Sequence, residues 1–173
     1  KGVLYAIVDR PDNKQYRELF STPEAIAAVK EGKPIPSGTV LTLVQYAAKL
    51  DAQGNPEKGA NGRFIKDKLL AYTVMEKRAG WGAEYPDNIR NGEWEYQAFR
   101  ADKTVNDKAN LKNCFVCHKP HEGQDYVISL ASLSGTAPGA AKRPSGPGTV
   151  AIADFLFVPE KIGGKAGQSI SWT

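Results

Sequence analysis

Hydrophobic and polar residues alternate in short runs along the first hundred positions, a pattern typical of β-strands. The runs predict four strands, at residues 3–8, 38–50, 64–77 and 93–99. A different signal stands at residues 21–24, where two hydroxyl residues precede Pro and Glu. That order predicts a hydroxyl-capped helix, which ends near Gly32. The chain is therefore rich in strands and has few helices.

The amino-acid composition changes after the first 133 residues. Residues 134–148 (SGTAPGAAKRPSGPG) are dense in Gly, Pro, Ala and Ser, which is linker composition. Strand signals resume in residues 149–173. We therefore expect a domain at residues 1–135, a linker at 136–148 and a further, partial segment at 149–173.

Composition narrows the class of protein. The 173 residues suffice for one domain with an appendage, and the net charge of +4 is modest. Lys and Arg are scattered without a basic block, so nucleic-acid binding is not expected. Apolar runs such as residues 155–158 are too short to cross a bilayer. The start at Lys1, without a signal peptide, suggests a mature or trimmed chain. The positive charge fits docking to an acidic redox partner, or simply a solvated surface.

Residues 114–118 (CFVCH) form a Cys-x-x-Cys-His motif, the attachment sequence of a c-type haem. If this segment is helical, residues three and four apart share a face. The thiols of Cys114 and Cys117 would then form two thioethers to the haem, while His118 binds the iron. Both cysteines of the chain lie in the motif. Covalent haem attachment of this kind indicates a periplasmic or otherwise extracytoplasmic protein.

Three other interpretations of the motif are less favourable. A redox Cys-x-x-Cys usually lies near a βαβ pattern, and the sequence around it shows none. A zinc site would take Cys114, Cys117, His118 and His121, but these fall within eight residues, which is awkward for a closed tetrahedron. A disulfide between Cys114 and Cys117 would close a very short loop and stabilise little. Covalent haem is the reading that the motif favours.

Four segments carry a resemblance to a known family: GTVLTLVQ, YTVMEKRAGWGAEY, GEWEYQAF and CFVCHKPHEGQDYVIS. Through them residues 1–133 resemble the cytochrome P-460 family, which includes the cytochromes c′-β. The resemblance implies an α+β, mainly β fold, in which an antiparallel sheet with packed helices carries the haem. It also implies a homodimer and a five-coordinate iron with one open face. P-460 members oxidise hydroxylamine through a haem cross-linked to a lysine, whereas c′-β members bind nitric oxide or carbon monoxide.

The chain departs from the P-460 pattern at the cross-linking lysine. That position falls on Leu43, and Lys49 lies six residues further along. The first predicted strand (VLYAIV) also lacks the arginine that the resemblance implies. A leucine over the iron would make a dry site suited to a neutral diatomic ligand, although Leu43 could equally be an ordinary core residue. The leading hypothesis is a c-type haem protein that binds nitric oxide or carbon monoxide.

Two alternatives remain, and they leave open whether the protein is an enzyme. An electron-transfer cytochrome would need a sixth ligand, such as Met75 or His121, although core packing is the simpler role for Met75 and His121 lies on the side of His118. An oxidoreductase of hydroxylamine or nitrogen oxides would need a general base. Three glutamates on predicted strands are candidates: Glu76, Glu93 and Glu95.

The last segment resembles the opening strands of a cupredoxin, the small blue-copper fold. The matching stretches are VAIADF, FVP and GQSISW, within residues 149–173. A blue-copper site needs two His, a Cys and an axial ligand, and the sequence has no His or Cys after His121. We therefore expect no copper in this chain. The two strands are expected to pair with the haem domain or with another subunit, an arrangement that also suits an electron carrier once coupled to a copper domain.

Overall fold

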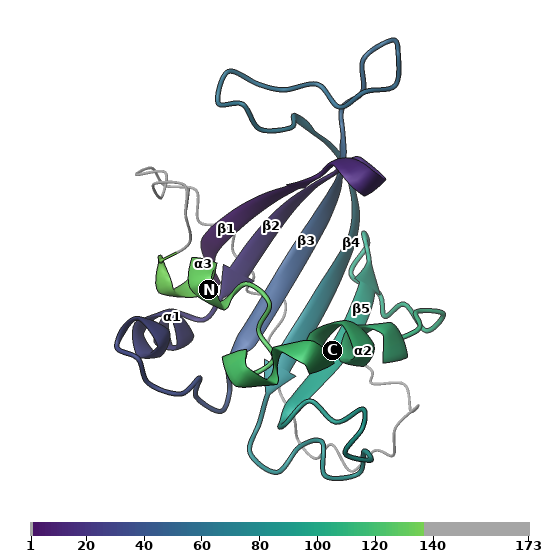
Figure 1. The fold of residues 1–173 in the computed structure, drawn as a ribbon. Coiled ribbons are helices and arrows are strands. Elements are labelled where there is room, and N and C mark those ends of the chain that lie inside the picture. The colour runs from purple at the N-terminus through teal and green to yellow at the C-terminus, as the bar shows by residue number, and fades with distance from the viewer. Residues whose placement is uncertain (1, 137–173) are drawn as a thin grey trace.

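Five strands form one antiparallel sheet in the order β1-β2-β3-β4-β5, so that neighbours in space are neighbours in sequence (Figure 1). The computed structural model describes residues 2–136. The strands are β1 (Val3–Arg10), β2 (Gln15–Ser21), β3 (Val40–Ala48), β4 (Lys66–Lys77) and β5 (Trp94–Arg100). The expected antiparallel, mainly β architecture is confirmed for this part of the chain.

The sheet differs from the sequence prediction at β1 and β2. Strand β1 continues past Val8 to Arg10, so the first strand does contain an arginine. Strand β2 was not predicted, because its polar residues interrupt the apolar run by which the other strands are recognised. Tyr16, Glu18 and Phe20 are buried, while Gln15, Arg17 and Leu19 between them are only partly covered. Pairing with β1 on one side and β3 on the other holds this polar segment extended.

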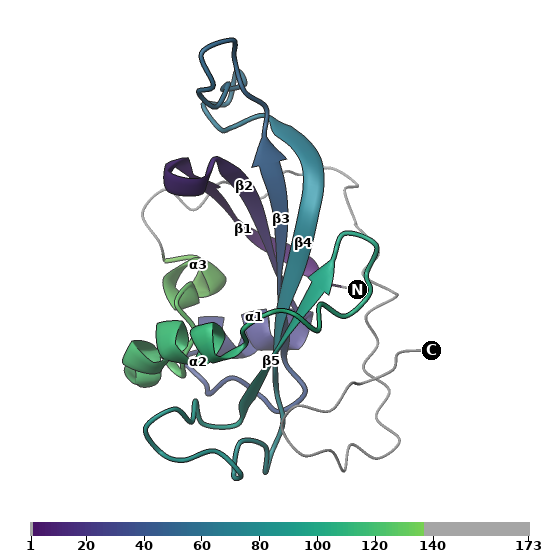
Figure 2. The ribbon, with the colours of Figure 1, turned by 90° about the vertical axis from the view of Figure 1, so that its right-hand side faces the viewer.

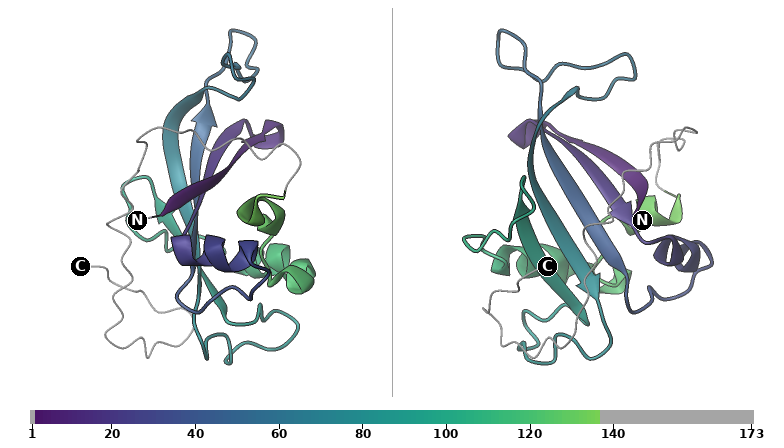
Figure 3. Two further views of the ribbon diagram at one scale, coloured as in Figure 1. Left: turned by 90° about the vertical axis from the view of Figure 1, so that its left-hand side faces the viewer. Right: turned by 180° about the vertical axis from the view of Figure 1, so that it is seen from behind.

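The three α-helices lie on one face of the sheet (Figures 2 and 3). They are α1 (Pro23–Lys30), α2 (Lys112–His118) and α3 (Leu130–Ser134), and two short 3-10 turns are η1 (Pro11–Asn13) and η2 (Lys119–Gln124). The helix predicted after residue 21 is thus confirmed as α1. Its cap differs from the prediction, because Thr22 stands at the N-cap but its hydroxyl makes no capping hydrogen bond.

The helices cover one end of this face and bury a row of side chains there. Leu41, Met75 and Tyr96 are cross-strand neighbours, and they share a core cluster with Ile26 of α1 and Phe115 of α2. Because successive side chains alternate between the two faces of a strand, this buried row shows which residues point toward the helices. Counting along each strand from this row, every second residue also points toward the helices.

None of the helices within residues 2–136 is long and apolar enough to cross a membrane. The expected linker at 136–148, apart from Thr136, and the cupredoxin-like segment at 149–173 lie outside the described residues.

Candidate functional site

Helix α2 carries the Cys-x-x-Cys-His motif, and the helical turn expected for it is confirmed. Phe115 points into the core, where its ring lies 4.8 Å from the rings of both Tyr85 and Tyr96. Cys114 is partly buried, Cys117 is exposed, and both thiols are free. Burial raises the pKa of the Cys114 thiol, and the neighbouring Cys117 adds to this effect. Two unbonded thiols one helical turn apart are available to attach a cofactor.

The His118 imidazole is held in a form ready to bind a metal. Its Nδ1 lies 2.7 Å from the backbone carbonyl oxygen of Tyr126. Burial lowers the pKa of His118, an effect that the hydrogen bond to Tyr126 opposes. The ring is therefore neutral at pH 7, with Nδ1–H donating to the carbonyl, and Nε2 carries the lone pair. The ring also packs at 5.1 Å from the ring of Tyr96, which fixes its tilt.

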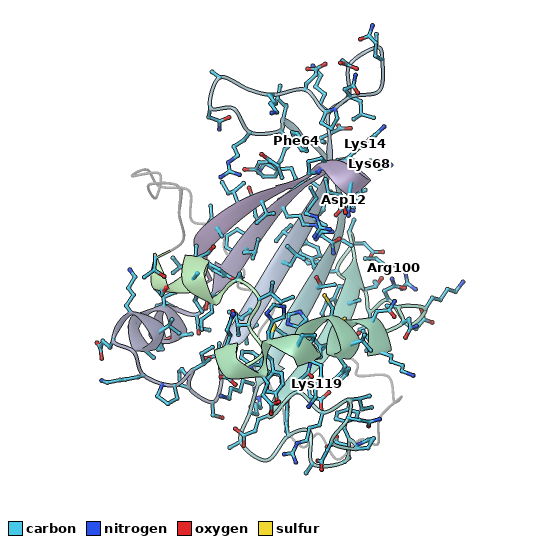
Figure 4. The ribbon with its side chains drawn as sticks, viewed as in Figure 1. Asp12, Lys14, Phe64, Lys68, Arg100 and Lys119 are labelled. Carbon is cyan, nitrogen blue, oxygen red and sulfur yellow. The ribbon has the colours of Figure 1, made fainter. Side chains whose placement is uncertain are left out.

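The loop between β4 and β5 fixes α2 against the sheet. Asn91 is fully buried. Its Nδ2 donates to the Tyr96 hydroxyl at 2.8 Å and to the Phe115 carbonyl at 3.1 Å. Lys119, labelled in Figure 4 at the start of η2, donates from Nζ to the Arg90 carbonyl at 2.9 Å. Sequence reasoning missed Asn91, since nothing in the local pattern marks a buried asparagine in a loop.

A second row of side chains crosses the helix-covered face next to the buried row. We call it the central row, and by strand register it comprises Ala6, Leu19, Leu43, Thr73 and Ala98. Leu43 stands at its middle, between Leu19 and Thr73, and all three are only partly buried. Leu43 thus lies on the same face as the motif helix, one row beyond the tightly packed core. The central row contains no ionisable side chain.

Arginines follow in the next row along the strands. This row, the arginine row, comprises Val8, Arg17, Gln45, Ala71 and Arg100. Arg17 is partly buried and donates from Nε to Gln15 Oε1 at 2.8 Å. Burial lowers the pKa of Arg17. Arg10 lies one position further on the same face. Its guanidinium pairs with Asp12, and this hydrogen bond raises the pKa of Arg10.

Neither candidate for a sixth iron ligand, Met75 or His121, lies in the central row or the arginine row. Met75 belongs to the buried row and is 7% exposed within the core cluster, as the simpler interpretation held. His121 lies in η2, directly after the helix that bears His118, and contributes to lowering the pKa of His118. His121 therefore lies close in sequence to His118, and its distance from a haem iron stays a prediction.

The candidate bases and the alternative lysine are also separated from the motif. Glu76 and Glu95 face each other across β4 and β5. Since Glu95 alternates with Tyr96, both carboxylates lie on the face opposite the helices. Glu93 accepts a hydrogen bond from the Gly80 amide at 2.9 Å. Lys49 follows the end of β3 and pairs with Glu57 at 2.9 Å.

The donor set at α2 suits a haem rather than a multi-ligand metal centre. Within residues 2–136, no group of three or more His, Cys, Asp or Glu side chains is arranged to hold a metal ion. Two free thiols, one neutral imidazole and a partly buried apolar row are instead the elements of a site for a large apolar cofactor with one axial ligand. Fold and site together define a strand-rich haem-binding domain.

The chain belongs to the cytochrome P460 family, whose model matches residues 2–129. It is therefore a haem protein of the P460 type, and the matched range ends just after the motif and the Tyr126 turn. No curated protein matches the sequence.

Proposed function

We propose that this protein is an extracytoplasmic c-type haem protein that binds nitric oxide or carbon monoxide at a five-coordinate iron. The observation that carries the proposal is the position of Leu43 in the central row, on the face that α2 covers. The haem, when bound, supplies an iron with one open position for a diatomic ligand.

Three side chains of α2 would hold the haem. Cys114 and Cys117 provide the thiols for two thioethers, and His118 provides Nε2 as the axial ligand. The hydrogen bond from Nδ1 to the Tyr126 carbonyl, 2.7 Å long, keeps the imidazole in the required tautomer. These residues attach and orient the cofactor.

Leu43 and its neighbours would line the side of the haem away from His118. Leu19, Thr73 and Leu43 offer methyl and methylene groups and a single hydroxyl, so this side excludes anions and holds water weakly. A neutral diatomic molecule pays little desolvation cost there. Arg17 and Gln45, one row further, would form a polar rim beside these apolar side chains.

Hydroxylamine oxidation is supported less well by the same residues. Leu43 stands where the family resemblance implies a cross-linking lysine, and Lys49 is engaged with Glu57 outside β3. Glu76 and Glu95 alternate with the helix-facing residues of β4 and β5, so their side chains leave the sheet on the face opposite the central row.

Absorption spectra of the haem-loaded protein test the proposal. A pyridine haemochrome spectrum typical of two thioethers is expected, and the ferrous protein is expected to be high-spin and five-coordinate before any ligand is added. A low-spin ferrous spectrum at that stage would refute the five-coordinate assignment and favour an electron-transfer cytochrome. A red-shifted ferrous band with a cross-linked peptide in a digest would favour the hydroxylamine-oxidising type.

The Leu43→Ala variant tests whether Leu43 limits the access of ligands to the iron. Replacing the isobutyl side chain by a methyl group opens the approach to the iron, so the association rate of carbon monoxide should rise by about tenfold, which corresponds to roughly 1.4 kcal/mol of steric barrier. Leu50→Ala is the matched control, because Leu50 is 43% exposed and lies outside the strands. Equal rates for Leu43→Ala and the wild type would show that Leu43 is an ordinary packing residue.

A further inference from the structure

Two consecutive residues after η2 adopt a backbone conformation that side-chain-bearing residues rarely take. Asp125 has φ 49° and Tyr126 has φ 60°, both in the left-handed region. Such residues persist only where their surroundings hold them. The turn that they make places the Tyr126 carbonyl oxygen 2.7 Å from Nδ1 of His118. The orientation of that carbonyl therefore depends on whatever holds the turn.

The carboxylate of Asp125 is bound by two neighbouring strands at once. Lys77 Nζ reaches Oδ2 at 2.7 Å, and Trp94 Nε1 donates to Oδ1 at 3.3 Å. Lys77 and Trp94 are direct cross-strand partners at the ends of β4 and β5. Trp94 is fully buried and the Lys77 side chain is 13% exposed, so both donors are firmly placed. One carboxylate thus connects the turn to the rigid edge of the sheet.

Tyr126 itself is held by other contacts. Its backbone N–H donates to the His121 carbonyl at 2.8 Å, and its hydroxyl donates to Glu122 Oε1 at 2.9 Å. Its ring lies against Gly92, where an added Cβ would come within 3.0 Å of the ring. These contacts fix the side chain and the N–H of Tyr126, while the carboxylate of Asp125 connects the preceding residue of the turn to the sheet.

We propose that Asp125 is a positioning residue for the axial histidine, acting through the Tyr126 carbonyl to set how strongly His118 donates to the haem iron. The inference rests on the proposed function, since it takes His118 as the iron ligand. A well-aligned Nδ1–H···O hydrogen bond gives the imidazole more imidazolate character and makes Nε2 a stronger donor. If the turn at Asp125 and Tyr126 becomes looser, the hydrogen bond from Nδ1 weakens, and Nε2 of His118 then donates less strongly to the iron.

The Asp125→Asn variant isolates this effect with almost no change in volume. Lys77 and Trp94 donate to different oxygens of the carboxylate, and in the amide one of those oxygens is replaced by an NH2 group that cannot accept, so one donor loses its partner. The Fe–His stretching band in the resonance Raman spectrum of the ferrous protein should move to lower frequency. The midpoint potential should move to a more positive value, because a weaker donor stabilises the ferric state less.

Glu122→Gln is the matched control. It changes a carboxylate on the same segment that touches the Tyr126 hydroxyl and not its carbonyl. It should leave the stretching band and the potential at their wild-type values. If Asp125→Asn binds haem and keeps both values unchanged, or if Glu122→Gln shifts them equally, the proposal is wrong.

Two further variants keep the test valid if Asp125→Asn does not fold. Lys77→Met and Trp94→Phe each remove one donor to the Asp125 carboxylate, and both should shift the band in the same direction by a smaller amount. No shift in either variant would overturn the proposal. Failure of the proposed function is recognised separately, since the wild-type ferrous protein would then lack the Fe–His band of a five-coordinate haem.

Discussion

One buried side chain, that of Asn91, holds helix α2 against strand β5. The two hydrogens of its amide go to the Tyr96 hydroxyl on β5 and to the Phe115 carbonyl within α2. Both acceptors would lose a partner if the amide were removed, and unsatisfied buried groups cost about 1–3 kcal/mol each. The loop that contributes Asn91 is therefore part of the site, although it carries no ligand.

Glu95 is predicted to make the stability of the protein depend on pH. Burial raises the pKa of Glu95 from 4.5 to about 7, and its Tyr85 hydrogen bond only partly opposes the shift. Because the folded state binds the proton more tightly than the unfolded state, this contribution is fully present below pH 4.5. It is lost as the pH rises through about 7.

Glu95→Gln should remove this dependence. The variant should be more stable than the wild type at pH 8 by on the order of 2 kcal/mol, and the two should converge near pH 4. Urea unfolding followed across this pH range measures the difference. A difference that stays constant from pH 4 to 8 would contradict the shifted pKa.

At the scale of elements, α2 is too short to be stable alone. It has seven residues, and isolated helices of that length are marginal in water. Its position depends on Phe115, which is 6% exposed and packs between Tyr85 and Tyr96. One aromatic side chain thus connects the haem-binding motif to the core.

Phe115→Ala should destabilise the protein by about 3–5 kcal/mol, the range for truncating a buried aromatic residue. Val116→Ala is a control within the same helix, because Val116 is 58% exposed. It should cost less than about 0.5 kcal/mol. Chemical denaturation of both variants gives the comparison, and equal losses would show that α2 is held by something other than the Phe115 contact.

At the scale of the whole molecule, the helix-covered face of the sheet carries both the larger core cluster and the candidate site. The helices bury the row of Leu41, Met75 and Tyr96, and the next row, with Leu43, is left partly covered. The segment after α2 returns to the sheet through Asp125, Lys77 and Trp94. The sheet and the motif helix, including His118, are therefore expected to unfold together.

Haem loading should raise the thermal stability of the whole domain, because a cofactor bound to the folded state stabilises it. The Cys114→Ser, Cys117→Ser double variant, purified without haem, should unfold at least about 5 °C below the haem-loaded wild type. In the wild type, the far-ultraviolet circular dichroism and the haem absorption should change at one temperature. Loss of the haem signal well before the sheet melts would mean that α2 detaches independently.

Much of this arrangement could be predicted from particular residues. The runs of apolar, strand-forming residues in 38–50 and 64–77 predicted β3 and β4, and the spacing of Cys114, Cys117 and His118 indicated that a helical turn would bring them onto one face. Strand β2 could not be predicted, because Gln15, Arg17 and Glu18 mask its buried side and it becomes a strand through its two neighbours. Arg10 was missed for the same reason, since pairing with Gln15 extends β1 beyond its apolar run.

The sequence alone predicted how a haem would be attached, because the positions of two thiols and an imidazole at fixed spacing depend only on local helical geometry. It also determined the family, to which residues 2–129 belong. The tertiary structure decided what surrounds that chemistry. Strand register, a property of pairs of distant segments, placed Leu43 between Leu19 and Thr73 and moved Glu76 and Glu95 to the other face. The Asp125 turn, whose partners lie 48 and 31 residues away, could be found only where the folded chain brings them together.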